Sequence, residues 1–107
     1  MTKGNKQTKL ARFDLLPPKP WWMVAERAGA GAEKYGDNNF RLGYEFSKSY
    51  QALQRHLSQF WSGEDIDPEC PHGTHHLSAV VFHCLALMQN QIDYPHFDDR
   101  WRKPQEP

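Results

Sequence analysis

Histidines and carboxylates recur through residues 29–83 at spacings that fit helices joined by one acidic loop. Carboxylate oxygens suit hard cations, and imidazole nitrogens suit borderline metals. Magnesium or manganese held in this way can bridge phosphate oxygens and lower the pKa of an attacking water. The pattern predicts a site for Mg²⁺ or Mn²⁺ built from four carboxylates, with three histidines as ligands or bases: Glu33, Glu64, Asp67 and Glu69, with His56, His76 and His83.

Three other interpretations of these residues stay open. A solvated acidic loop explains Glu64, Asp65 and Asp67 equally well. A zinc site is possible from Cys70, His72, His75 and Cys84, although the Cys70–His72 spacing is tight and no paired C-x-x-C supports it. Phosphate binding is the third, by the scattered cations Lys9, Arg12, Lys34, Arg41 and Arg55. The chain has no P-loop, G-x-G-x-x-G or G-x-S-x-G sequence, so serine-nucleophile catalysis has no support.

Three helices are predicted to position these groups. Apolar residues at three- and four-residue steps indicate a first helix from about Trp21 to Tyr35. The segment from Leu10 to Pro20 is expected to be extended, because its prolines disfavour a helix, with Pro20 as the first helical residue. Gly29 and Gly31 each cost roughly 1 kcal/mol inside a helix. We expect a neighbouring helix or a ligand to approach closely there.

The second helix is predicted from about Phe46 to Trp61, with His56 at the boundary between its apolar stripe and water. The third is predicted from near Thr74, a possible N-cap, to about Ile92, and it is apolar on almost all sides. Such a helix is expected to be central and buried, with Cys84 as a core thiol. His76 and His83 share one of its faces, about 10 Å apart.

The chain has 107 residues, which suits one domain. We expect a flexible N-terminus (1–9), a helical domain (10–101) and a C-terminal tail (102–107), with Phe97 and Trp101 anchoring the region after the third helix. Thirteen basic and thirteen acidic residues give no net charge, which argues against binding long nucleic acid. The sequence has no apolar run long enough for a membrane span and no signal peptide, so a cytoplasmic protein with two free thiols is expected.

Several stretches resemble a known family: residues 11–18 (ARFDLLPP), 31–40 (GAEKYGDNNF), 55–57 (RHL), 63–69 (GEDIDPE) and 76–77 (HL). In order and spacing they are similar to the phage family named for the N-terminal domain of dATP/dGTP diphosphohydrolase. That family is grouped with the MazG-like, all-α nucleotide pyrophosphatases. The resemblance spans roughly residues 9–100.

The resemblance implies an all-α domain: a small bundle of three main helices with extended N- and C-terminal arms. It implies metal-dependent hydrolysis of a purine deoxynucleoside triphosphate to the monophosphate and pyrophosphate, in the host cytoplasm if the protein is phage-encoded. The family would carry a histidine at position 79 and an asparagine at position 83, where this chain has Ala79 and His83.

Together, the residues and the resemblance give three predicted roles. The metal ligands are Glu33, Glu64 and Asp67, with His83 in place of a lost ligand. The catalytic groups are His56, His76 and Glu69, and the phosphate-binding groups are Lys9, Arg12 and Lys34. A homodimer is expected to complete the small bundle. The alternative function is a non-catalytic phage module that binds nucleotides or proteins.

Overall fold

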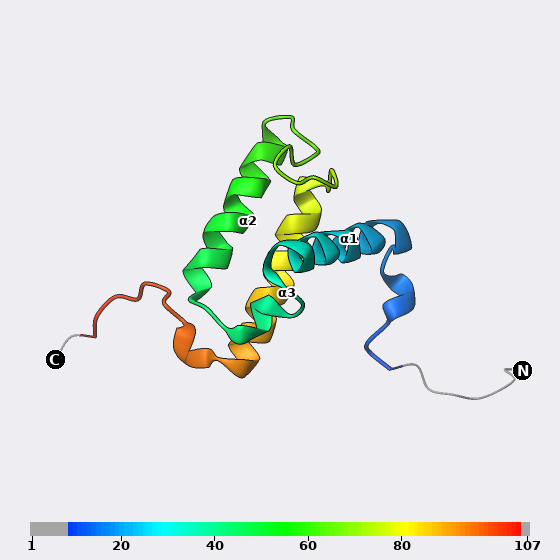
Figure 1. Ribbon diagram of the computed structural model, residues 1–107. Coiled ribbons are helices and arrows are strands. Elements are labelled where there is room, and N and C mark those ends of the chain that lie inside the picture. The colour runs from blue at the N-terminus through cyan, green and yellow to red at the C-terminus, as the bar shows by residue number, and fades with distance from the viewer. Residues whose placement is uncertain (1–8, 106–107) are drawn as a thin grey trace, which may run out of the picture.

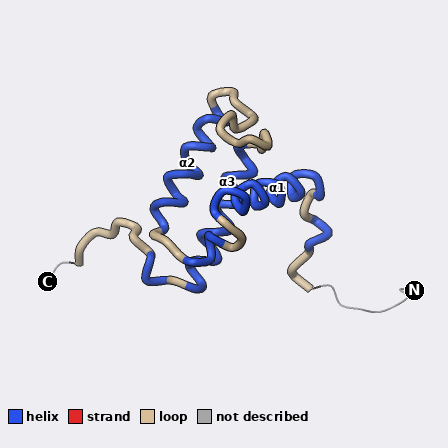
Figure 2. Tube along the Cα trace, viewed as in Figure 1, coloured by secondary structure: helices blue, strands red, loops and turns tan. Residues whose placement is uncertain are grey.

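The computed structural model describes residues 9–105, which form three long helices and three short 3-10 turns (Figure 1). The long helices are α1 (Pro18–Tyr35), α2 (Phe46–Trp61) and α3 (His76–Asp93). The turns are η1 (Phe13–Leu15), η2 (Asn39–Leu42) and η3 (Pro95–Phe97). No strand occurs within residues 9–105, and a loop-rich arm lies at each end (Figure 2). The predicted all-α class is confirmed. Most of the predicted flexible N-terminus and the last two tail residues lie outside the described residues.

Helices α2 and α3 lie side by side and run in opposite directions, and α1 crosses α3 (Figure 1). The long connection between α2 and α3, residues 62–75, lies at the end of the pair where α2 finishes and α3 begins (Figure 1). None of the helices within the described part of the chain is both long enough and apolar enough to cross a membrane.

Helix α1 begins at Pro18, earlier than the prolines were expected to allow. The first turn of a helix has backbone N–H groups without intrahelical partners, so Pro18 and Pro20 sacrifice no hydrogen bond there. Trp21 donates the first helical hydrogen bond, to the carbonyl of Pro17 at 3.1 Å. The helix ends at Gly36, whose φ of 95° suits glycine.

Helix α2 has the predicted bounds, and the tail after α3 stabilises its start. The carboxylate of Asp99 accepts a hydrogen bond from the backbone N–H of Ser47 at 2.9 Å, which places a negative charge at the positive end of the helix. Gly43 has a φ of 88°, and a Cβ there would lie 2.8 Å from the ring of Tyr94 and 2.9 Å from that of Phe97. The tail is therefore held by Asp99 and Phe97. The expectation for Trp101 was wrong, because its side chain is 82% exposed.

Helix α3 is central but not buried on all sides. His75, rather than Thr74, caps it, because the His75 Nδ1 accepts the N–H of Leu77 at 3.0 Å. The inner stripe is small and polar, and it includes His76, Ala79, Ala86 and Asn90. Because α1 and α2 cover only part of the helix, its outer side chains, Cys84 among them, are left exposed. The prediction of a buried Cys84 was therefore wrong; both thiols are free.

Candidate functional site

Histidines from α2 and α3 meet in the interior. The Nδ1 atoms of His56 and His76 are 2.9 Å apart, and their side chains are almost fully buried. The ring of His83 stacks on that of His56, with centroids 6.4 Å apart and planes at 24°. The predicted boundary position of His56 was wrong, because residue 56 is only 2% exposed. The apolar periodicity of α2 could not predict this burial, because loop 62–75 and α1 cover this flank of the helix.

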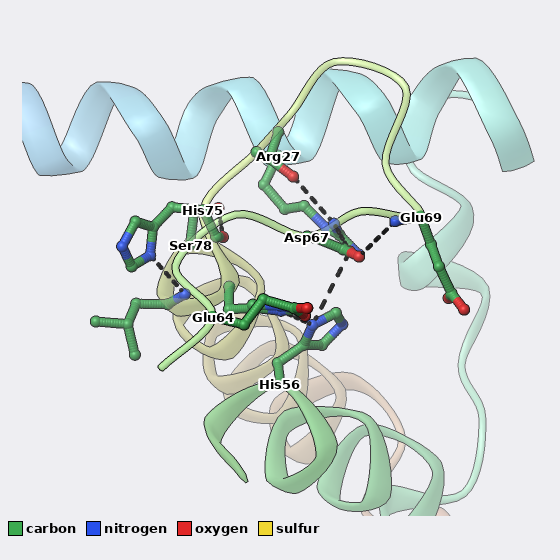
Figure 3. Close-up of polar contacts among 10 residues, drawn as sticks. Arg27, His56, Glu64, Asp67, Glu69, His75 and Ser78 are labelled. Carbon is green, nitrogen blue, oxygen red and sulfur yellow. Dashed lines mark hydrogen bonds and ion pairs between the residues drawn. The ribbon is translucent and has the colours of Figure 1, made fainter. Parts of the chain in front are cut away.

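The acidic loop delivers one carboxylate to these histidines. The loop closes on itself through hydrogen bonds from the Asp67 N–H to the Thr74 carbonyl, at 2.9 Å, and from the His76 N–H to the Asp65 carbonyl, at 2.8 Å. This closure turns Asp67 inward, where it is 5% exposed, while Asp65 faces solvent. Asp67 Oδ2 lies 4.0 Å from His56 Nδ1 (Figure 3). One ligand atom each from His56, Asp67 and His76 lies within 4.8 Å of the others, and we call these three residues the buried cluster.

Two donors fix the Asp67 carboxylate. Arg27 of α1 donates from Nη1 to Asp67 Oδ2 and to Thr74 Oγ1, each at 3.1 Å, and the Glu69 backbone N–H donates to Asp67 Oδ1 at 3.0 Å (Figure 3). Burial alone would raise the pKa of Asp67. The hydrogen bonds from Glu69 and Arg27 outweigh it and hold that pKa below its usual value. Asp67 is therefore a buried anion with a defined orientation.

Each histidine of the site has a distinct polar environment. His76 Nε2 lies 2.7 Å from Glu64 Oε1. A carboxylate accepts, so Nε2 carries a proton and the lone pair of a neutral His76 lies on Nδ1, facing His56. Burial, with nearby Arg27, lowers the pKa of His56 to about 4, and burial likewise lowers that of His83 to about 4. Both are neutral at pH 7. His56 Nε2 is buried and has no hydrogen-bond partner among residues 9–105.

The structure does not bring the remaining predicted carboxylates into the buried cluster. Glu33, on the exposed face of α1, pairs with His72. Glu69 contributes its backbone N–H rather than its carboxylate. Glu64 touches the cluster from its solvent side, with 44% of its side chain exposed. His83 lies beside the cluster and hydrogen-bonds Ser49 through Nδ1 at 3.1 Å.

The predicted phosphate-binding cations are dispersed. Arg12 forms a two-point contact with Asp14, at 2.8 and 2.7 Å. Lys34 lies over the ring of Tyr35, and Lys9 is exposed. The structure does not support the alternative zinc site, because Cys70, His72, His75 and Cys84 do not form a metal-binding group within residues 9–105.

Arg27 was missed by the sequence reasoning, although its position carried a signal. It lies three residues after Val24, beside the apolar stripe of α1, and its side chain is only 21% exposed. A cation on the buried flank of a helix needs an anionic partner. The partner is 40 residues away in the sequence, and only the loop closure reveals it.

We expect the metal-free protein to lose stability as pH falls. The pKa of His56 is lower in the folded chain (about 4) than its ordinary value of 6.5, so its stabilising contribution is complete above pH 6.5 and is lost as pH falls toward 4. His83 acts in the same direction. Between about pH 7 and pH 5, His56 alone should lower the free energy of unfolding by roughly 1–2 kcal/mol.

Urea unfolding at several pH values measures this dependence. The variant His56→Gln should show a shallower pH dependence than the wild type, whereas His96→Gln, which changes an exposed histidine, should not. Equal slopes for the wild type and His56→Gln would contradict the account.

The family model described as dATP/dGTP diphosphohydrolase, N-terminal, matches residues 1–100. No curated protein and no solved structure matches the chain.

Proposed function

Because the chain belongs to the family dATP/dGTP diphosphohydrolase, N-terminal, we propose that it hydrolyses a purine deoxynucleoside triphosphate to the monophosphate and pyrophosphate with a divalent metal. The observation that carries the metal part of this proposal is the buried cluster. Two imidazole nitrogens 2.9 Å apart lie beside a buried carboxylate, and one ligand atom from each of the three residues lies within 4.8 Å of the others.

The donors of the buried cluster fit a divalent ion. His56 is neutral, and a metal-binding imidazole must have a free lone pair. His76 binds a carboxylate through its other nitrogen, an arrangement that commonly orients metal-bound histidines. Mg²⁺ prefers a shell of oxygen atoms, whereas Mn²⁺ is less restricted, so a site with two nitrogen donors favours Mn²⁺. We therefore assign His56, Asp67 and His76 as ligands.

In this proposal the surrounding residues position the ligands and handle the proton. A bound ion would polarise a phosphate oxygen and make a water more acidic. Arg27 and the Glu69 N–H hold Asp67 in place. Glu64 fixes the tautomer of His76 and, because it is half-exposed at the edge of the cluster, is our choice for the general base that takes the proton from water. Glu33 and His83, predicted as ligands from the sequence, become residues to test.

Pyrophosphate release from each of the four common deoxynucleoside triphosphates tests the function. With Mn²⁺ present we expect equal amounts of monophosphate and pyrophosphate from dATP or dGTP, and little product from dCTP and dTTP. Chelation of the metal should stop the reaction. Folded, Mn²⁺-loaded protein that releases no pyrophosphate from any of the four would instead favour the non-catalytic binding module.

We also propose that two copies associate through α2 and α3. Tyr50, Leu57 and Trp61 form a stripe on α2 and are 58%, 39% and 87% exposed, and Met88 and Ile92 on α3 are 55% and 75% exposed. Tyr50 and Met88 line the same groove. Large apolar side chains grouped on adjacent helices are typical of an interface. A second copy would cover them and form a four-helix bundle from the two α2–α3 pairs.

Sedimentation at micromolar concentration should therefore show a dimer. Met88→Lys places a charge in the proposed interface and should shift the protein to monomer. Gln51→Lys adds the same charge at another exposed position and should leave the dimer intact. A wild-type protein that sediments as a monomer would remove the dimer proposal.

A further inference from the structure

A second feature lies directly behind the buried cluster. A pocket of about 710 Å³ opens between α1, the segment 36–40 and the facing sides of α2 and α3. We call it the glycine pocket; its lining includes Arg27, Gly31, Tyr35, Asn38, Phe82 and His83. Its volume is in the range that holds small molecules of nucleotide size. The sequence indicated only that a neighbouring helix or a ligand should approach Gly29 and Gly31, which both line this pocket.

Two glycines leave the α1 wall of the pocket bare. Gly29 and Gly31 both line it, and a Cβ built on either would find no heavy atom within 4 Å. Within residues 9–105 no neighbouring helix approaches them, so packing in this part of the chain does not account for glycine at these helical positions. Of the two compensations expected from the sequence, close approach of a ligand is the one that remains. A bare backbone face lets a flat ring lie directly on the helix.

Aromatic and polar side chains also line the pocket. Phe40 and Phe82 meet edge to face, with centroids 5.3 Å apart and planes at 75°, and both line the pocket. Aromatic rings of this kind stack on nucleobases. Asp37 and Asn38 line the pocket, and Asn38 has a φ of 60° in the left-handed region. An amide and a carboxylate can read the edge of a purine, which offers both donors and acceptors.

Two residues that line the pocket, Arg27 and His83, also contact the buried cluster. His83 lines the pocket and stacks on His56, and Arg27 lines the pocket while holding Asp67. The ring of His56 points from α2 toward Asp67 (Figure 3). Its Nε2 atom is buried without a partner in the described part of the chain, although residue 56 is only 2% exposed. A polar ligand that reaches past His83 and Arg27 would supply the missing partner.

We infer that the glycine pocket binds the nucleoside part of a purine deoxynucleotide, with the base between the glycine face of α1 and the Phe40–Phe82 wall. The phosphates then extend past Arg27 toward the buried cluster. This inference rests on the proposed function, which supplies the nucleotide class, but its site and residues are separate from the metal ligands. The pocket therefore sets base preference, and the buried cluster sets reactivity.

Binding of dGMP and dAMP to metal-free protein tests the inference without turnover. We expect both monophosphates to bind, with dCMP weaker. Gly31→Leu should weaken dGMP binding about tenfold or more, because the new side chain occupies the bare face of α1. The same variant should keep its Mn²⁺ affinity and unfold at a higher temperature, since leucine is a better helix former than glycine.

Ala25→Leu is the matched control, because Ala25 is exposed on α1 and does not line the pocket. It should leave dGMP binding unchanged. Wild-type protein that binds neither purine monophosphate, or Gly31→Leu that binds dGMP as tightly as the wild type, would overturn the inference. Because the probe is a product and no metal is present, purine binding without pyrophosphate release would reject the proposed function alone. Pyrophosphate release without any effect of Gly31→Leu would reject the pocket alone.

Discussion

Replacing His76 with glutamine is expected to weaken Mn²⁺ binding and slow pyrophosphate release together. His76 is fully buried, its Nδ1 lies 2.9 Å from that of His56, and its Nε2 bonds Glu64. Glutamine has a similar length but cannot present a ring nitrogen to the ion while its other end bonds Glu64. We expect Mn²⁺ affinity to fall about tenfold or more, equivalent to about 1.4 kcal/mol. Turnover should fall roughly a hundredfold, because residues that hold a catalytic metal act on every step it assists.

Calorimetric titration of Mn²⁺ into matched variants measures this effect. His96→Gln removes an exposed histidine and should bind Mn²⁺ as the wild type does. Glu33→Gln and His83→Asn test the two ligands that the sequence predicted outside the buried cluster. We expect both to keep Mn²⁺ affinity within about threefold, less than 1 kcal/mol. Loss of Mn²⁺ binding in Glu33→Gln but not in His76→Gln would place the metal on the exposed face of α1 instead.

Arg27→Leu is expected to cause the largest loss of stability. The guanidinium donates to Asp67 and Thr74, and the Asp67 side chain is only 7% exposed. Removing one partner of a buried ion pair leaves an uncompensated charge, so we expect the free energy of unfolding to fall by roughly 2–4 kcal/mol. The pKa of Asp67 should rise, because the remaining donor, the Glu69 N–H, no longer outweighs burial.

Urea unfolding at neutral pH measures the loss. Arg55→Leu makes the same replacement at an exposed position on α2 and should change stability by less than about 0.5 kcal/mol. If the two variants lose the same amount, the Arg27–Asp67 pair contributes no more than a surface ion pair. The site would then be held by the loop closure alone.

The sequence predicted well the elements whose signal is local. Helix α2 has the predicted bounds because one continuous apolar stripe defines it. The predicted start of α1 was too late. Proline is tolerated in the first turn of a helix, so the sequence does not show which of the prolines begins it. Helix α3 is apolar enough to suggest full burial, yet burial depends on how many neighbours cover a helix. The outer side of α3 is exposed. The hydrophobic pattern of a single helix does not predict how many other helices pack against it.

The candidate site depended on contacts that no local pattern records. Glu64, Asp67 and Glu69 look equivalent in the sequence, but the closure of the loop turns only Asp67 inward. That closure depends on hydrogen bonds between residues seven and eleven positions apart. The buried position of His56 likewise depends on the covering by α1 and the loop. The sequence predicted that histidines and carboxylates form the site. Which of several similar residues enter the buried cluster could be seen only in the fold.

We propose that His56, Asp67 and His76 hold the metal. The most direct test is anomalous diffraction at the manganese edge from crystals grown with Mn²⁺. The account predicts an anomalous peak within bonding distance of the Nδ1 atoms of His56 and His76 and of an Asp67 oxygen. A peak on the exposed carboxylates, such as Glu33 or Glu69, with none at the buried cluster, would contradict it.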